Sequence, residues 1–82
     1  MNEKIEMVKE ITAQRIVDRE AEQREALENI RELAERMLKD LENGCRLYEV
    51  NSMKSYTERL IVASTRMEAL QANMKMLEFL QK

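Results

Sequence analysis

The sequence predicts an all-α protein built as an antiparallel two-helix coiled-coil hairpin. Three observations lead to this fold class. The 82 residues include no proline and one glycine, and 37% of them are charged, a composition typical of long helices. An apolar register with alternating spacings of three and four residues runs through the second half, as in a helix that packs lengthwise on another helix. The two halves of the chain also carry net charges of opposite sign, which favours folding back.

The predicted first helix begins near Asn2 or Glu3, where acidic side chains suit the positive end of the helix dipole. Its opening stretch has an apolar face of moderate quality, formed by Ile5, Val8, Ile11, Ile16 and Val17. Residues 18–25 then contain a single apolar side chain, Ala21, and depend on helix propensity and charge pairs. A second apolar register follows at Leu27, Ile30, Ala34, Met37, Leu41, Gly44 and Tyr48.

These patterns divide the first helix into two parts. We expect residues 1–25 to form an N-terminal helical extension that projects or self-associates, because they have no obvious mate within the hairpin. Residues 26–82 are expected to form the hairpin itself. A protruding amphipathic helix is unstable alone, so dimerisation or a neighbouring domain would have to cover it.

The predicted second helix is defined by its register. Its apolar residues recur at every expected position: Met53, Tyr56, Leu60, Ala63, Met67, Leu70, Met74 and Leu77. Such a seam buries one side of a helix and leaves the rest in water. Its partner is expected to be the first helix, because residues 1–43 carry eight basic and twelve acidic residues, whereas residues 44–82 carry six basic and four acidic ones.

Two sites compete for the turn between the helices. Asn43 and Gly44 form a strong generic stop, which would give two arms of nearly equal length. Residues 50–55 are the alternative, because Asn51 and Ser52 disfavour helix interiors and the sequence from Ser55 to Glu58 is a good capping box. Under the second alternative Gly44 lies inside the first helix and permits close approach of the second. The local signals for the two sites are about equally strong.

Composition also excludes several classes of function. A net charge of −2 argues against nucleic acid as a main partner, because phosphate neutralisation carries such binding. The chain has no apolar run of about 18 residues and no basic, apolar leader, so we expect a cytoplasmic protein without direct membrane insertion. One cysteine and no histidine leave no zinc site, and no glycine-rich loop or positioned nucleophile is present. We therefore expect no catalytic, cofactor-binding or metal-binding residues, and no enzymatic activity.

Two segments of the sequence resemble a known protein family. Residues 41–47, with the sequence LENGCRL, and residues 58–70, with the sequence ERLIVASTRMEAL, resemble the HR1-type Rho-binding antiparallel coiled-coil finger of protein kinase N, rhotekin and anillin. The Glu-Arg-Leu-aliphatic-aliphatic-Ala run is most like the anillin version. The resemblance covers residues 38–80. It implies that Gly44 lies within a long first helix and that the turn falls at 50–55, with the second helix running from about Tyr56 to Leu80.

The resemblance also implies a function. The hairpin would be a noncatalytic effector module of an anillin-like cytoskeletal and cytokinesis scaffold, at the actomyosin cortex or cleavage furrow. It would recognise the switch surface of a GTP-bound Rho-family GTPase. The contacts implied lie on the exposed flank near the tip: Arg46, Glu49, Glu58, Arg59, Val62 and Arg66. The alternative function is a structural coiled coil for self-assembly or scaffolding without GTPase binding, including a homodimer formed through the N-terminal helix.

Overall fold

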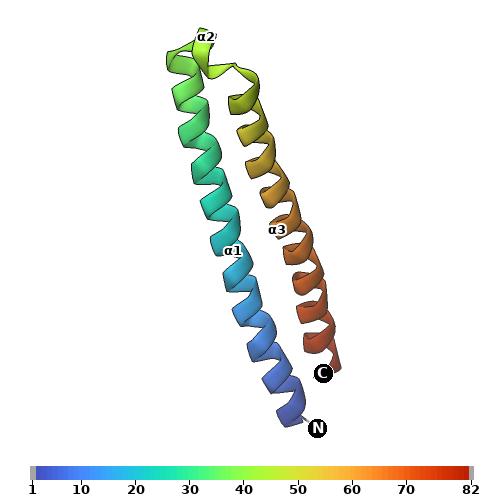
Figure 1. Ribbon diagram of the computed structural model, residues 1–82. Helices are drawn as coiled ribbons and strands as arrows, with labels where there is room; N and C mark the ends of the chain where they lie inside the picture. The colour runs from blue at the N-terminus through green and yellow to red at the C-terminus, as the bar shows by residue number, and fades with distance from the viewer. Residues whose placement is uncertain (1, 82) are drawn as a thin grey trace.

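The computed structural model describes residues 2–81 and contains three helices. These are α1 (Asn2–Lys39), α2 (Leu41–Gly44) and α3 (Leu47–Leu80). The two long helices lie side by side in opposite directions, and the short α2 lies between them at one end, the tip (Figure 1). The predicted all-α antiparallel hairpin is confirmed.

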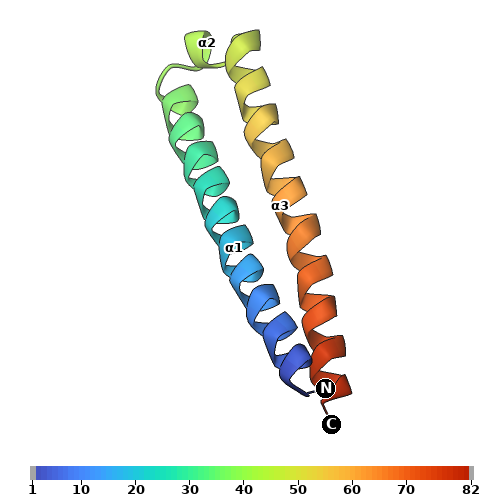
Figure 2. The same ribbon diagram turned by 60° about the horizontal axis from the view of Figure 1, so that its bottom comes forward.

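The end of the hairpin opposite the tip holds both termini, which lie close together in Figures 1 and 2. There the Lys9 ammonium donates to Gln81 Oε1 at 2.7 Å, and the Gln81 side-chain amide donates to Glu6. Residues 2–25 therefore belong to the continuous helix α1 and pair with the end of α3. The expectation that this segment projects beyond the hairpin is wrong, because α3 begins earlier than expected and its 34 residues nearly match the 38 of α1.

The turn lies at residues 40–46, so the preference for a turn at 50–55 was also wrong. Asp40 interrupts the helix with backbone angles of φ −141° and ψ 81° and caps α2 by accepting a hydrogen bond from the Asn43 backbone N–H. The Gly44 N–H then donates to the Asp40 carbonyl at 2.6 Å. These bonds give partners to the Asn43 and Gly44 N–H groups of the short helix α2.

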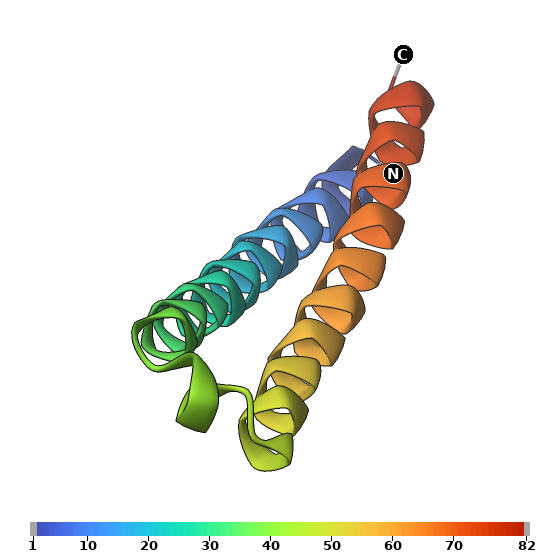
Figure 3. The same ribbon diagram turned by 90° about the horizontal axis from the view of Figure 1, so that it is seen from above.

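Gly44 is required by close approach and not by a left-handed conformation. No residue in the described part of the chain has a positive φ. A Cβ atom on Gly44 would lie 2.4 Å from the Met37 Cα and 2.9 Å from the Met37 carbonyl oxygen, both backbone atoms of α1. The absent side chain therefore allows α2 to fold back against the last turn of α1, as the view onto the tip shows (Figure 3).

The polar segment at residues 50–55 remains helical inside α3. The hydroxyl groups of Ser52 and Thr57 donate to the carbonyl oxygens of Tyr48 and Met53, four residues earlier, at 3.0 and 2.9 Å. Their hydrogen-bonding capacity is thus met without leaving the helix. The expected capping box at Ser55 is not formed, because the helix already runs through it from Leu47.

The predicted seam of α3 is confirmed, because all eight of its members are at least half-buried and Ala63 and Met67 are buried. The expected register of the first helix is partly confirmed, because Ile30, Ala34, Met37 and Gly44 are half-buried. The seam of α1 follows alternating spacings of four and three residues, at Ile5, Lys9, Thr12, Ile16, Arg19, Gln23, Ala26, Ile30, Leu33 and Met37, and Asn29 and Ala34 beside it are also half-buried. Leu27, Leu41 and Tyr48 of the expected register are exposed. Ala26, and not Leu27, is buried, as is Ala63 on α3, so small side chains occupy the middle of both seams.

The core is narrow and its centre is apolar. Leu33 is the largest fully buried side chain, with 1% of its surface exposed, and it is accompanied by Ala26, Ala63 and Met67. Towards the termini the seam of α1 becomes polar. The buried Thr12 hydroxyl donates to the Val8 carbonyl. No helix within residues 2–81 has the length and apolar character that crossing a membrane requires.

Candidate functional site

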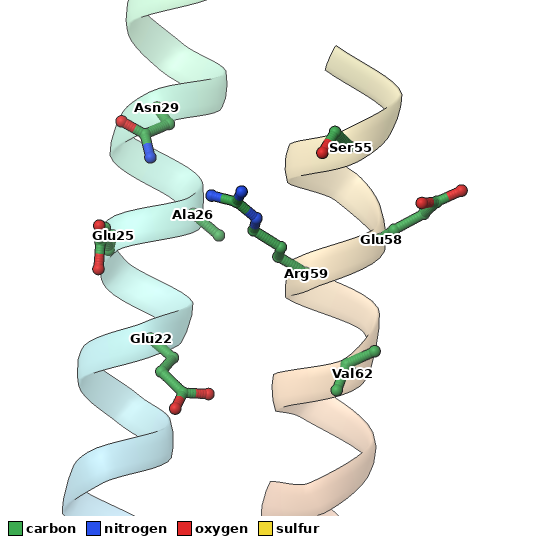
Figure 4. Close-up of a pocket in the computed structure, with 8 residues that line it drawn as sticks. All are labelled: Glu22, Glu25, Ala26, Asn29, Ser55, Glu58, Arg59 and Val62. Atoms are coloured by element: carbon green, nitrogen blue, oxygen red, sulfur yellow. The ribbon is translucent and has the colours of Figure 1, made fainter. Parts of the chain in front are cut away.

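An open groove of about 430 Å³ lies between α1 and α3 in the middle of the hairpin. Four of its lining residues come from each helix: Glu22, Glu25, Ala26 and Asn29 from α1, and Ser55, Glu58, Arg59 and Val62 from α3. Figure 4 shows the Arg59 side chain reaching across towards α1, between Ala26 and Asn29, while Glu58 points away from α1. The Arg59 guanidinium also lies over the Tyr56 ring, 5.8 Å from its centroid, a cation–π arrangement. We call this the acidic groove, because it has three carboxylates and one guanidinium.

A second groove, of about 330 Å³, follows towards the termini. It is lined by Arg15 and Arg19 of α1 and by Arg66, Ala69 and Leu70 of α3. Arg19 pairs with Glu22 at 3.2 Å, and its Nε atom is buried without a hydrogen-bond partner in the described structure. We call this the basic groove, because three guanidinium groups surround its apolar floor.

The two grooves lie on the same side of the hairpin. Arg15 and Glu22 are seven residues apart on α1, and Arg59 and Arg66 are seven residues apart on α3. Residues seven apart nearly superimpose when viewed along a helix, with a drift of about 20°. One side of the molecule, which we call the grooved face, therefore carries the acidic groove near its middle and the basic groove beside it.

The structure brings together only part of the predicted contact set. Glu58, Arg59 and Val62 line the acidic groove, and Arg66 lies in the neighbouring basic groove. Arg46 is the exposed N-cap residue of α3, and Glu49 lines a separate hollow at the tip. At 1.5 Å per residue, Glu49 and Arg66 are separated by roughly 25 Å along α3. The six residues therefore do not form one compact site.

Sequence reasoning missed the contribution of α1 to this face. The sequence predicts that Arg15, Arg19, Glu22 and Glu25 belong to an N-terminal extension, whereas the structure places them in the grooves beside α3. The signal that was available is the seven-residue repeat that links Thr12, Arg19, Ala26 and Leu33. Thr12 and Arg19 are polar, so the repeat is not visible as an apolar pattern.

The electrostatics of the tip depend on Asp40. The Asn43 side-chain amide donates to the Asp40 carboxylate at 2.6 Å, and the Asn43 backbone N–H donates at 3.2 Å. Both bonds favour the charged form, so they hold the pKa of the Asp40 carboxyl below its ordinary value of 3.8, with the side-chain bond the larger cause. This carboxylate is an exposed capping group that fixes the turn.

The grooves are lined by charged and apolar side chains. Within residues 2–81 no three histidine, cysteine, aspartate or glutamate side chains are grouped so that they could hold a metal ion. Cys45 is a free, exposed thiol at the tip. The grooved face presents guanidinium groups and carboxylates with apolar side chains between them.

Comparisons of the sequence with protein-family models, with curated proteins and with solved structures gave no match. The fold and the two grooves therefore define the class to which the molecule can be assigned, a helical hairpin with coiled-coil packing.

Proposed function

We propose that the chain is a noncatalytic structural coiled coil that acts by self-assembly, presenting the flanks of its hairpin to further helices. The observation that supports this function is the mismatch between core and surface. Four apolar residues are buried within residues 2–81, whereas fifteen large apolar side chains remain exposed. Apolar surface on this scale marks interaction sites in soluble proteins.

The exposed apolar side chains extend over much of the hairpin. Val62, Met76 and Leu80 are exposed on α3, and Val8 and Ile11 on α1. A two-helix hairpin of this size has one narrow seam and little area to offset its conformational entropy. Association of hairpins buries a second layer of side chains and supplies the missing stabilisation.

Sedimentation equilibrium over a wide range of protein concentration tests this function, together with thermal unfolding followed by circular dichroism. We expect oligomers, and an unfolding temperature that rises with concentration because association stabilises the folded state. A monomer at the highest concentration, with a constant unfolding temperature, would contradict the proposal.

A second candidate is the Rho-GTPase-binding effector module implied by the family resemblance. Its support is that three of the six implied contact residues, Glu58, Arg59 and Val62, line one groove. The position of the turn departs from the family pattern, since Gly44 ends α2 and does not lie inside a long first helix. Under this candidate the chain would be part of an anillin-like scaffold at the actomyosin cortex or cleavage furrow. It would bind the switch surface of the GTP-bound GTPase.

Titration of the chain with Rho-family GTPases loaded with GTP or GDP tests the second candidate. The expected result is tighter binding of the GTP form and a loss of at least tenfold in affinity for Arg59→Glu. Arg31→Glu, an exposed charge reversal on α1, is the matched control and should leave the affinity unchanged. Equal or absent binding of the two nucleotide forms would contradict this function.

A further inference from the structure

The basic groove holds positive charge that the hairpin does not neutralise. Its three guanidinium groups come from both long helices, Arg15 and Arg19 from α1 and Arg66 from α3. Among residues 2–81 the ion pairs within 4.0 Å are Arg19 with Glu22 and Lys54 with Glu58. Arg15 and Arg66 therefore have no carboxylate partner in the part of the chain that the structure describes.

Arg19 is an unusual residue for the position that it occupies. It lies on the seam of α1, in the register that buries Ala26 and Leu33 farther along the helix. Its side chain is 22% exposed, and its Nε atom is buried with no hydrogen-bond partner among the described residues. A leucine at this position would avoid the cost of an unsatisfied donor. Departures of this kind from favourable packing are expected at functional sites.

The groove has the size and the lining of a small-ligand site. Its volume is about 330 Å³, at the lower end of the range of roughly 300–1,000 Å³ for small-molecule sites. Ala69 and half-buried Leu70 supply an apolar floor beside the guanidinium groups. A ligand that joins one anionic group to a small apolar group would match both parts of this lining.

The unpaired charge of the groove selects phosphate over carboxylate. A guanidinium group can bind either anion through two parallel hydrogen bonds. A phosphate monoester carries a charge of about −1.5 to −2 at pH 7 and three strong acceptor oxygens. It would balance Arg15 and Arg66 together, whereas a carboxylate would balance only one of them.

The surroundings of the groove favour a soluble ligand over a membrane surface. An anionic membrane attracts extended clusters of basic residues. The neighbouring groove on the same face instead presents Glu22, Glu25 and Glu58, and the whole chain has a net charge of −2. The positive charge of the basic groove is therefore local, as a small ligand requires.

We propose that the basic groove is a binding site for a small phosphate monoester, in which the guanidinium groups of Arg15, Arg19 and Arg66 bind the phosphate and Ala69 and Leu70 contact its apolar group. This inference goes beyond the proposed self-assembly and does not depend on it.

Phenyl phosphate is the probe that tests the site, with binding followed by ¹H–¹⁵N NMR titration at neutral pH and low salt. We expect saturable shifts of the amide resonances around the basic groove, and an unfolding temperature that rises with probe concentration. Inorganic phosphate, which lacks the apolar group, and benzoate, which carries a single negative charge, should bind more weakly. No saturable shift at the groove, or equally tight binding of either comparison anion, would overturn the proposal.

Two variants assign the binding to these arginines. Arg15→Gln combined with Arg66→Gln should weaken the binding of phenyl phosphate by about tenfold or more, because hydrogen bonds to a charged group are lost. Arg19→Leu should weaken it by about fivefold or more, because one of the three guanidinium groups is lost. Arg19→Leu also removes an unsatisfied buried donor, so its loss of binding would not result from unfolding. Unchanged affinity in both variants would overturn the assigned site.

A second groove on the hairpin offers a matched control. Arg24 and Arg31 line a hollow on α1 together with Glu20 and Glu28, so its charges balance. Arg24→Gln combined with Arg31→Gln changes the net charge of the chain by the same amount as the double variant of the basic groove. It should leave the affinity for phenyl phosphate unchanged. An equal loss of affinity in this control would show a general charge effect and overturn the proposal.

Cosedimentation with phosphatidylcholine vesicles that contain phosphatidic acid, a lipid with a phosphate monoester headgroup, separates a soluble ligand from a membrane. We expect no more protein in the pellet than with phosphatidylcholine alone. Binding to the phosphatidic acid vesicles without binding of soluble phenyl phosphate would overturn the proposed class of ligand.

Discussion

At the scale of single residues, the hairpin depends on a few side chains whose environments differ sharply from those of their neighbours. Leu33 is almost completely buried, whereas Leu38, five residues later on the same helix, is 72% exposed. Gly44 lies against the α1 backbone, and Asp40 holds the turn through Asn43. Each of these positions gives a prediction with a defined direction.

Replacing Leu33 by alanine should lower the free energy of unfolding by about 2–5 kcal/mol, the range for deleting a buried leucine side chain. The same change at exposed Leu38 should alter it by less than about 0.5 kcal/mol. Urea unfolding followed by circular dichroism measures both. Equal effects of the two substitutions would contradict the seam that we assign to α1.

Gly44→Ala should destabilise the hairpin by about 1–3 kcal/mol, because the new methyl group must displace backbone atoms of Met37 or move α2. In an ordinary helix interior the same change would stabilise, since alanine has the higher helix propensity. The sign of the change in urea midpoint therefore distinguishes the close approach at the tip from a Gly44 buried in a continuous helix.

The Asp40 cap predicts a pH dependence of the tip. Because the folded-state pKa is below its ordinary value of 3.8, the cap stabilises the turn above that value, and this contribution is lost as the pH falls through the folded-state pKa. The ¹³C resonance of the Asp40 carboxyl should titrate with a midpoint below 3.8. In Asp40→Asn the acid-induced shift of the Asn43 amide resonance should disappear; a midpoint at the ordinary value would contradict the capping geometry.

At the scale of elements, the seam by which α1 packs on α3 changes in polarity along its length. Its seam is apolar near the tip, at Ile30, Leu33 and Met37, and largely polar towards the N-terminus, where Lys9 and Thr12 occupy seam positions. Gln23 donates across the seam to the Ser64 hydroxyl at 3.1 Å. The hairpin should therefore open first at the end that holds the termini, where less apolar area is buried.

The substitution Arg19→Leu tests the cost of the polar seam. The Arg19 side chain is 22% exposed, and its Nε atom is buried without a hydrogen bond within the described residues. Leucine should raise the free energy of unfolding by roughly 1 kcal/mol, because an unsatisfied buried donor is removed. Urea unfolding in dilute solution measures the change. Arg24→Leu at an exposed position of α1 is the control and should have almost no effect.

At the scale of the whole molecule, the hairpin is a rod 61 Å long whose narrow core leaves much apolar and charged surface for a partner. Association of two hairpins, as proposed above, would bury part of this surface and stabilise both chains.

Raising the NaCl concentration from about 0.05 M to about 0.5 M should keep or increase the affinity of the proposed self-assembly, because the surface that it buries is apolar. Sedimentation velocity at a series of salt concentrations measures the dissociation constant. The Debye length falls from roughly 14 Å to roughly 4 Å over this range, so a marked loss of affinity would indicate charge pairing and contradict association through apolar side chains.

From the sequence alone the class of fold and one of the two seams are predicted correctly. The uninterrupted register from Met53 to Leu77 is typical of a helix with a lengthwise partner, and the composition favours long helices. The sequence also contained both turn sites, because Asn43 with Gly44 and the Ser55 capping box are each sound local signals. Because the two local signals are of similar strength, the sequence does not show which of the two sites forms the turn.

The turn, the seam of α1 and the grooved face depend on contacts between the two long helices. Only when both arms are laid together does a turn at 40–46 emerge as the solution that pairs all of α1 with α3, and burial along the whole seam outweighs the helix-disfavouring Asn51 and Ser52. The same pairing places Leu33 and not Leu27 in the core, and it brings Arg15 and Arg19 beside Arg66. These are contacts between residues distant in sequence, and no periodicity within one helix contains them.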